Sequence, residues 1–239
     1  MKRISCLVRS IEYFNEDTRM LLLEFPDGAQ VDFKAGQYLE IVLPGKNCPF
    51  SIASSPARKD AIELHIRPTP DSEDSVEIEK LLDSGVDHIE INFPLGDCVL
   101  EAAPDKPMIL LAASTGVTQM NSIIEYLRPN GIDQPIHLYW GVVADKDLYL
   151  DSHFRNLMKK HKNFHYIPVV SEPETSPEWR GRSGLVGEVA LQDFDDLSNV
   201  TVYVGGSPGM VYATLDAFVA QGLPEGNMYS DVFSYAPRK

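Results

Sequence analysis

The sequence predicts two domains of different class, an N-terminal antiparallel Greek-key β-barrel at residues 1–102 and a doubly wound parallel α/β domain at residues 103–239. Short apolar segments separated by turn residues fill the first hundred positions, which is typical of an antiparallel barrel. After a linker at residues 102–107, continuous apolar segments alternate with segments of helical spacing. This alternation indicates a parallel sheet that is covered on both faces.

The composition limits the classes of partner. The formal net charge of −14 argues against nucleic acid and anionic membrane surfaces. No apolar segment is long enough to span a bilayer, and the N-terminus has no signal-peptide core. The three cysteines are scattered, with no disulfide framework and no iron–sulfur or zinc spacing. We therefore expect a cytoplasmic protein with reduced thiols, no metal site and small-molecule ligands.

The elements of the first domain follow from apolar spacing. We expect strands at residues 5–11, 18–25, 38–43, 62–67 and 89–93, with turn residues between them. A helix is expected after Pro70, because Ser72 or Ser75 can cap it and Gly85 can end it.

The segment Pro49-Phe50-Ser51-Ile52 follows one of these strands. Pro49 has no amide hydrogen, so the segment fits an edge strand that faces a cleft better than a central strand. Ser51 places a hydroxyl donor and acceptor between apolar neighbours. Such a segment can hold a flat ring with polar edges. An ordinary barrel strand with a surface serine explains the same residues equally well.

In the second domain we expect parallel strands at residues 108–112, 136–140, 164–170, 200–204 and 228–233. Helical spacing predicts helices at residues 118–127, around 154–158 and at 210–219.

Small residues follow three of the predicted parallel strands, at 113–116, 141–142 and 205–209. The carboxyl ends of parallel strands are the usual ligand-binding edge of such a sheet. The first and third segments lead into predicted helices, whose unpaired N-terminal amides suit a pyrophosphate. Together these segments favour a dinucleotide site over ordinary turns.

Several motifs appear in a fixed order along the chain: Ala-Gly-Gln-Tyr at 35–38, Pro-Phe-Ser-Ile-Ala at 49–53, Glu-Leu-His at 63–65, Tyr-Trp-Gly at 139–141, Tyr-Ile-Pro-Val-Val at 166–170, Met-Tyr-Ser-Asp at 228–231 and Phe-Ser-Tyr at 233–235. In this order they resemble the bacterial NAD(P)H:flavin oxidoreductases, a branch of the ferredoxin–NADP reductase superfamily. The sequence is especially similar to the flavin reductases that supply reduced flavin mononucleotide (FMN) to bacterial luciferase.

The resemblance implies that the protein transfers a hydride from NADH or NADPH to FMN, riboflavin or FAD, which binds as a substrate. It implies a catalytic Ser51 near flavin N5. The flavin-binding residues that it implies are Pro49, Phe50, Ser51, Ile52, His65, Ile66 and Arg67, with Phe233 and Tyr235 beside the flavin. The nicotinamide-binding residues that it implies are Ala113, Ser114, Thr115, Gly116, Trp140, Gly141, Gly205, Gly206, Ser207 and Met210. A reduced-flavin acceptor such as a monooxygenase is an expected partner.

Two departures from the family pattern bear on binding strength. Cys48 stands where many members have arginine, which removes a cationic contact to the flavin. Ala113 and Ser114 replace two glycines of a Gly-Gly-Thr-Gly loop, which predicts weaker nicotinamide binding. Asp145 favours NADH over NADPH, although Lys146 and Arg182 leave NADPH open. Two alternatives remain open, a reductase component that holds its flavin for a partner oxygenase and a non-catalytic relative.

Overall fold

The computed structural model describes residues 1–29 and 31–238, and it divides into two compact units. The first unit comprises Met1–Glu101 together with Asn121–Tyr126, and the second comprises Ala102–Met120 together with Leu127–Lys239. The chain therefore leaves the first unit after Glu101 and returns to it for six residues of one helix.

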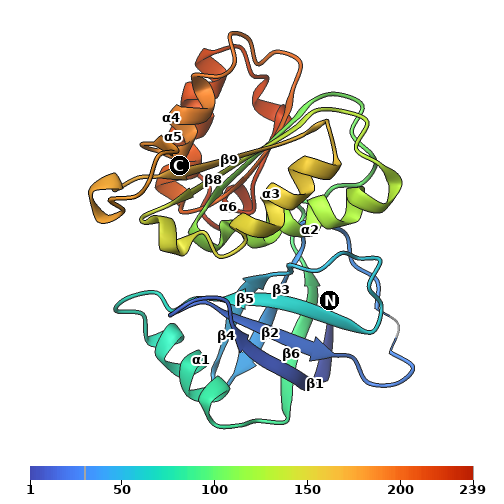
Figure 1. The fold of residues 1–239 in the computed structure, drawn as a ribbon. Helices are drawn as coiled ribbons and strands as arrows, with labels where there is room; N and C mark the ends of the chain where they lie inside the picture. The colour runs from blue at the N-terminus through green and yellow to red at the C-terminus, as the bar shows by residue number, and fades with distance from the viewer. Residues whose placement is uncertain (30, 239) are drawn as a thin grey trace. The chain divides into compact units, whose positions relative to one another are not determined.

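The first unit is built on a six-stranded antiparallel sheet with the strand order β4-β3-β6-β1-β2-β5 (Figure 1). This sheet confirms the predicted antiparallel barrel class. Alternate residues of β2 and β3 are buried, as the apolar spacing predicts. The strands are β1 (Lys2–Tyr13), β2 (Arg19–Glu24), β3 (Tyr38–Leu43), β4 (Lys46–Ser51), β5 (Ala61–Ile66) and β6 (His88–Leu95).

Strand β4 lies at an edge of this sheet and pairs with β3, with Pro49 opposite Glu40. The edge position predicted from Pro49 is confirmed. Helix α1 (Glu73–Asp83) follows β5. Ser72 is its N-cap, and the Ser72 side chain accepts a hydrogen bond from the Ser75 amide. Gly85 follows the helix with a φ of +70°, a conformation that favours glycine.

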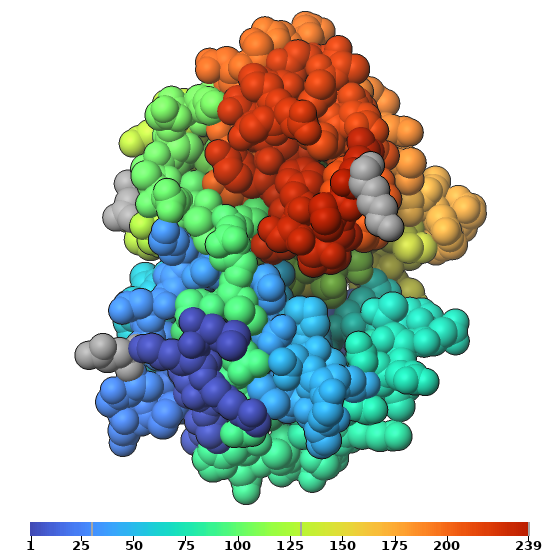
Figure 2. Space-filling model, turned by 180° about the vertical axis from the view of Figure 1, so that it is seen from behind, coloured from blue at the N-terminus to red at the C-terminus, as the bar shows by residue number. Residues whose placement is uncertain are grey.

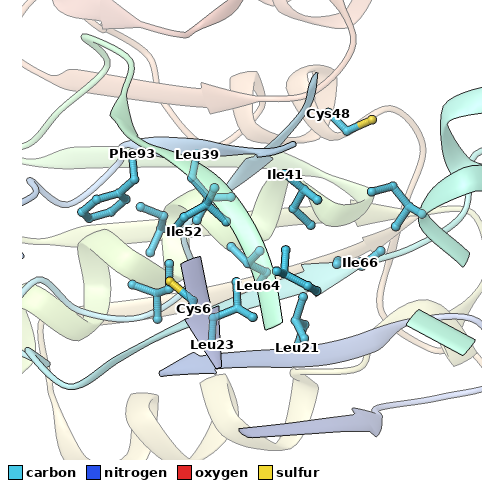
Figure 3. Close-up of a cluster of buried hydrophobic side chains, with 14 of the residues drawn as sticks. Cys6, Leu21, Leu23, Leu39, Ile41, Cys48, Ile52, Leu64, Ile66 and Phe93 are labelled. Carbon is cyan, nitrogen blue, oxygen red and sulfur yellow. The ribbon is translucent and has the colours of Figure 1, made fainter. Parts of the chain in front are cut away.

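The core of the first unit is a cluster of aliphatic and aromatic side chains from all six strands (Figure 3). It includes two cysteines, and Cys6 has no exposed surface. Burial raises the pKa of the Cys6 thiol to about 12. All three cysteines of the chain are buried free thiols.

The sheet of the second unit is parallel, with the strand order β10-β9-β8-β7-β11-β12. Its strands are β7 (Met108–Ala113), β8 (Ile136–Val142), β9 (Phe164–Val170), β10 (Arg182–Ser183), β11 (Thr201–Gly205) and β12 (Met228–Tyr229). The strand predicted at 228–233 was wrong beyond Tyr229. The Ser230 hydroxyl accepts the Val232 amide, and this turn starts a short helix, α6 (Val232–Tyr235).

Helices cover both faces of the parallel sheet, which confirms the doubly wound class. On one face, side chains of α4 and α5 form a single core with strand residues such as Ile109 and Val202. On the other face, Phe154 of α3 packs against Trp140 and Tyr166. The helices are α2 (Val117–Leu127), α3 (Asp151–Lys160), α4 (Val186–Leu191) and α5 (Pro208–Ala220). None of the described helices is both long and apolar enough to cross a membrane.

Candidate functional site

The strand order of the parallel sheet reverses at β7, which has β8 on one side and β11 on the other. Such a switch point is the usual ligand-binding crevice of an open parallel sheet. Two of the three predicted small-residue segments, 113–116 and 205–209, meet here. A Cβ atom on Gly116 would lie 2.3 Å from the Gly205 carbonyl oxygen, and one on Gly205 would lie 2.8 Å from the Gly116 oxygen. The loops touch backbone to backbone, so only glycine fits at either position.

Two helices begin directly after these glycines. Helix α2 begins at Val117, and α5 begins at Pro208 with Ser207 as its N-cap. The Ser207 hydroxyl accepts the Met210 amide. Thr118, in the first turn of α2, has a buried hydroxyl with no hydrogen-bond partner among the residues that the structure describes. Helix N-termini with unpaired backbone amides suit the phosphates of a dinucleotide.

A cavity of about 390 Å³ opens beside the switch point. Its volume lies within the range of small-molecule sites. Glu188 is the one charged residue among those that line it. The lining residues are Ala113, Ser114, Gly141, Val142, Val143, Ser171, Gly184, Leu185, Val186, Gly187, Glu188, Met210, Ala213, Thr214 and Ala217.

Four of the predicted nicotinamide residues therefore line this cavity, namely Ala113, Ser114, Gly141 and Met210. Sequence reasoning missed the lining contributed by residues 184–188 and by one face of α5. The only sequence signal was a pair of glycines. A Cβ atom on Gly187 would lie 2.6 Å from the Thr214 hydroxyl, so this glycine permits close packing of α4 on α5.

Trp140 is placed inside the core, with no exposed surface. Its Nε1 donates a 2.9 Å hydrogen bond to the Ser114 carbonyl oxygen. Ser114 has a φ of +51°, in the left-handed region where a side chain costs free energy. The indole thus fixes a strained loop residue at the cavity wall, at a position where the family pattern has glycine.

We expect Ser114→Gly to lower the Michaelis constant for reduced nicotinamide by about threefold, because it removes a side chain from the cavity wall and relieves a strain of about 1 kcal/mol. Steady-state kinetics with varied NADH measures this change. Ala113→Gly is the matched control. Ala113 also lines the cavity but has an extended backbone with φ −112°, so this variant loses about 0.5 to 1 kcal/mol of stability with no strain to relieve. An equal decrease of the Michaelis constant in both variants would contradict the role of the strained Ser114 backbone.

The first unit has its own cavity, of about 190 Å³, between β4, β5 and the start of α1. Pro49, Phe50, Ile66 and Arg67, all predicted to bind flavin, line it together with Cys48. The remaining lining residues follow β5 along the chain: Pro68, Thr69, Ser72, Asp74, Ser75, Ile78 and Glu79. The segment 68–79 was not predicted as part of the site, because its serines and acids read as a helix cap and a solvated helix face.

The other predicted flavin residues lie outside this cavity wall. Ile52 is fully buried in the barrel core. The His65 side chain is fully buried, with Nε2 2.8 Å from a Glu63 carboxylate oxygen and its ring edge-on to Phe14. Ser51 is half-buried at the end of β4. Arg67, on the cavity wall, donates from Nε to Asp17 at 2.8 Å.

Two side chains of α2 hold the peptide that follows the Pro-Phe-Ser-Ile motif. Asn121 Nδ2 donates to the Ala53 carbonyl oxygen at 3.0 Å, and Ser122 Oγ donates to the Ser54 oxygen at 2.8 Å. Both belong to the six-residue segment of α2 that groups with the first unit. The sequence carried no signal for these contacts, because α2 follows the linker and was assigned to the second domain.

The two predicted C-terminal aromatic residues lie in α6. Phe233 packs on the Tyr212 ring with a centroid distance of 5.6 Å. Tyr235 is 65% exposed. This end of the chain, the darkest red in Figure 2, forms part of the surface of its unit.

Two family models match this chain, and known proteins resemble it along nearly its whole length. Residues 5–99 match the oxidoreductase FAD-binding domain family, and residues 110–216 match the oxidoreductase NAD-binding domain family. A probable flavin reductase of Photobacterium leiognathi is 36% identical over 97% of this chain and 98% of its own length. An NAD(P)H-flavin reductase of Vibrio harveyi is 32% identical over 97% of this chain and 99% of its own length. The crystal structure of Amycolatopsis cytochrome P450 reductase GcoB superposes with a TM-score of 0.86 at 26% identity, over 96% of this chain and 69% of that one.

The fold and the two cavities, with these matches, define an oxidoreductase that uses a flavin and a nicotinamide, of the ferredoxin–NADP reductase superfamily. Within it, the chain belongs to the NAD(P)H-flavin reductase family. The resemblance inferred from the motifs is confirmed.

Proposed function

We propose that the protein reduces a free flavin with NADH and releases the reduced flavin to other acceptors. The observation that supports this best is that each unit has a cavity where independently predicted ligand residues meet. Pro49 and Phe50 line one cavity, and Ala113 and Gly141 line the other. A reductase of this class needs one site for each heterocycle.

The residues of the first unit fit a flavin. An edge strand leaves backbone amides and carbonyls for the polar rim of a ring, and Pro49, Phe50 and Ile66 offer apolar contact. When bound, the flavin supplies the N5 atom that accepts a hydride from the nicotinamide ring. Ser51, at the end of β4, would donate its hydroxyl proton in a hydrogen bond to N5 and orient the ring. Asn121 and Ser122 hold the next peptide in place through two carbonyl groups.

The residues of the second unit fit a dinucleotide. The backbone contact between Gly116 and Gly205 leaves room for phosphates near two helix N-termini. The largely apolar wall of the cavity excludes water from the ligand. None of these groups needs to act as an acid or a base, because a hydride transfer moves no proton to the protein.

Oxidation of NADH by the purified protein, measured with and without added riboflavin or FMN, tests the proposal. We expect oxidation that depends on added flavin and saturates with it. A protein that binds neither flavin nor NADH, or that binds both without turnover, would refute it.

We expect NADH to be preferred over NADPH by at least about tenfold in kcat/KM, since a 2′-phosphate brings roughly two negative charges without a matching cation. The cavity wall offers Glu188, and Arg182 is already held by both Asp193 oxygens at 3.0 Å. Kinetics with both nucleotides at low and high salt measures the preference. Equal efficiency at low salt would contradict it.

A reductase component that retains its flavin for a partner oxygenase is the second candidate. The similarity to a cytochrome P450 reductase favours it. Gel filtration of the protein after incubation with flavin separates the two candidates. A flavin-free protein peak supports the free-flavin reductase, and a yellow protein peak supports the component.

A further inference from the structure

The lining of the cavity in the first unit contains more carboxylates than cations. Asp74 and Glu79 line it, and Arg67 is the one cation among its described lining residues. Ser72, Ser75 and Thr69 add hydroxyl groups. Its volume of about 190 Å³ is below the roughly 300 Å³ of typical ligand pockets, so it has room for part of a flavin and not for the whole molecule.

The cations around this cavity are already paired with carboxylates. Arg67 donates to Asp17 at 2.8 Å. Lys46, on the neighbouring β4, contacts Asp74 at 2.7 Å and Glu77 at 3.1 Å.

Arg19 contacts Glu79, which lines the cavity, at 2.6 Å and Asp83 at 2.7 Å. The second Glu79 oxygen is buried and accepts no hydrogen bond within the described part of the chain. Carboxylates therefore outnumber cations here, and a buried acceptor is left without a donor.

The N-terminus of α1 would ordinarily attract a phosphate through its unpaired amides. In this chain the Ser72 hydroxyl already accepts the Ser75 amide. Glu73 and Asp74 place two negative charges in the first turn, where they interact favourably with the helix dipole. The charge that a phosphate would supply is already present in the protein.

From these contacts we infer that the cavity holds the uncharged ribityl chain of the flavin and disfavours a phosphate, so that riboflavin is the preferred substrate over FMN and FAD. This inference rests on the proposed function. Ribityl hydroxyls both donate and accept, which matches serine hydroxyls and carboxylate oxygens. A phosphate is acceptor-only and would face Asp74 and Glu79 with about two negative charges of its own.

Titration of the protein with oxidised riboflavin, FMN and FAD, followed by quenching of flavin fluorescence without nicotinamide, tests the inference. At low salt we expect riboflavin to bind at least about tenfold more tightly than FMN, and we expect this gap to shrink at about 1 M salt. Asp74→Asn should lower the ratio of the FMN to the riboflavin dissociation constant by about threefold, because it removes one negative charge that faces the phosphate.

Glu77→Gln is the matched control, because it removes the same charge from the same helix and from the same lysine, while Glu77 does not line the cavity. It should leave the ratio unchanged. Equal affinity of the wild-type protein for riboflavin and FMN at low salt would overturn the inference, and so would equal shifts in the two variants. Binding that follows the expected order without any NADH oxidation would instead refute the proposed function alone.

Discussion

Gly116→Ala is expected to reduce flavin-dependent NADH oxidation by about a hundredfold, because the loops at the switch point can no longer touch. The new Cβ atom would lie 2.3 Å from the Gly205 oxygen and 2.6 Å from its carbonyl carbon. Both neighbours are backbone atoms, so neither can rotate away. The loops must separate, which displaces the start of α2 and the end of β11 from the nucleotide. We also expect a loss of about 2 kcal/mol in the free energy of unfolding.

Gly209→Ala is the control for this variant. Gly209 lies in the first turn of α5, and nothing lies within 4 Å of an added Cβ atom there. Alanine in a helix is favoured over glycine by about 1 kcal/mol, so this variant should be as active as the wild type and at least as stable. Thermal unfolding and NADH oxidation measure both quantities. A fully active Gly116→Ala protein would show that the two loops do not shape the nucleotide site.

Ser51→Ala is expected to lower kcat with saturating NADH and riboflavin by about a hundredfold, which is the usual cost of losing one hydrogen-bond donor from a reacting centre. Stability should change by less than about 1 kcal/mol, because Ser51 ends an edge strand and is only half-buried. A large loss of turnover in a protein that unfolds normally separates a role in the reaction from a role in the fold.

Ser55→Ala makes the same chemical change four residues later. The Ser55 hydroxyl accepts the Ala57 amide within a turn, and Ser55 lines neither cavity. Its kcat should match that of the wild type. If both serine variants turned over normally, the group that orients the flavin would have to be sought elsewhere, and the backbone of β4 would be the first candidate.

Most strands of this fold could be predicted because each has a local signal. Residues 38–43 alternate between buried and partly exposed positions, and residues 164–170 are rich in aromatic and β-branched side chains. Both strands were predicted at their observed bounds. The prediction of the last strand failed because the apolar residues at 228–229 and 232–233 read as one strand across Ser230 and Asp231, whereas the Ser230 hydroxyl accepts the Val232 amide in a turn. Helix α4 was missed because it has six residues, too few for a helical period to emerge.

The residues of the candidate site also fall into those with a local signal in the sequence and those without one. Gly116, Gly141 and Gly205 were found because close packing against a backbone or a side chain leaves a glycine in the sequence. The acidic wall around Asp74 and Glu79 was not found, since its role depends on which face of α1 meets β4. Hydrogen bonds from Asn121 and Ser122 to peptides 68 residues earlier depend on the tertiary fold and leave no pattern in either segment.

The buried thiols have a consequence for an enzyme that releases reduced flavin in air, where dihydroflavin passes electrons to oxygen and forms hydrogen peroxide. The thiolate form of cysteine attacks hydrogen peroxide, which breaks the O–O bond and oxidises the sulfur to a sulfenic acid. Cys6 has no exposed surface and a pKa of about 12, and burial together with the nearby Asp74 carboxylate raises the pKa of Cys48. Both sulfur atoms therefore remain protonated at neutral pH, which slows their oxidation by the peroxide that turnover generates.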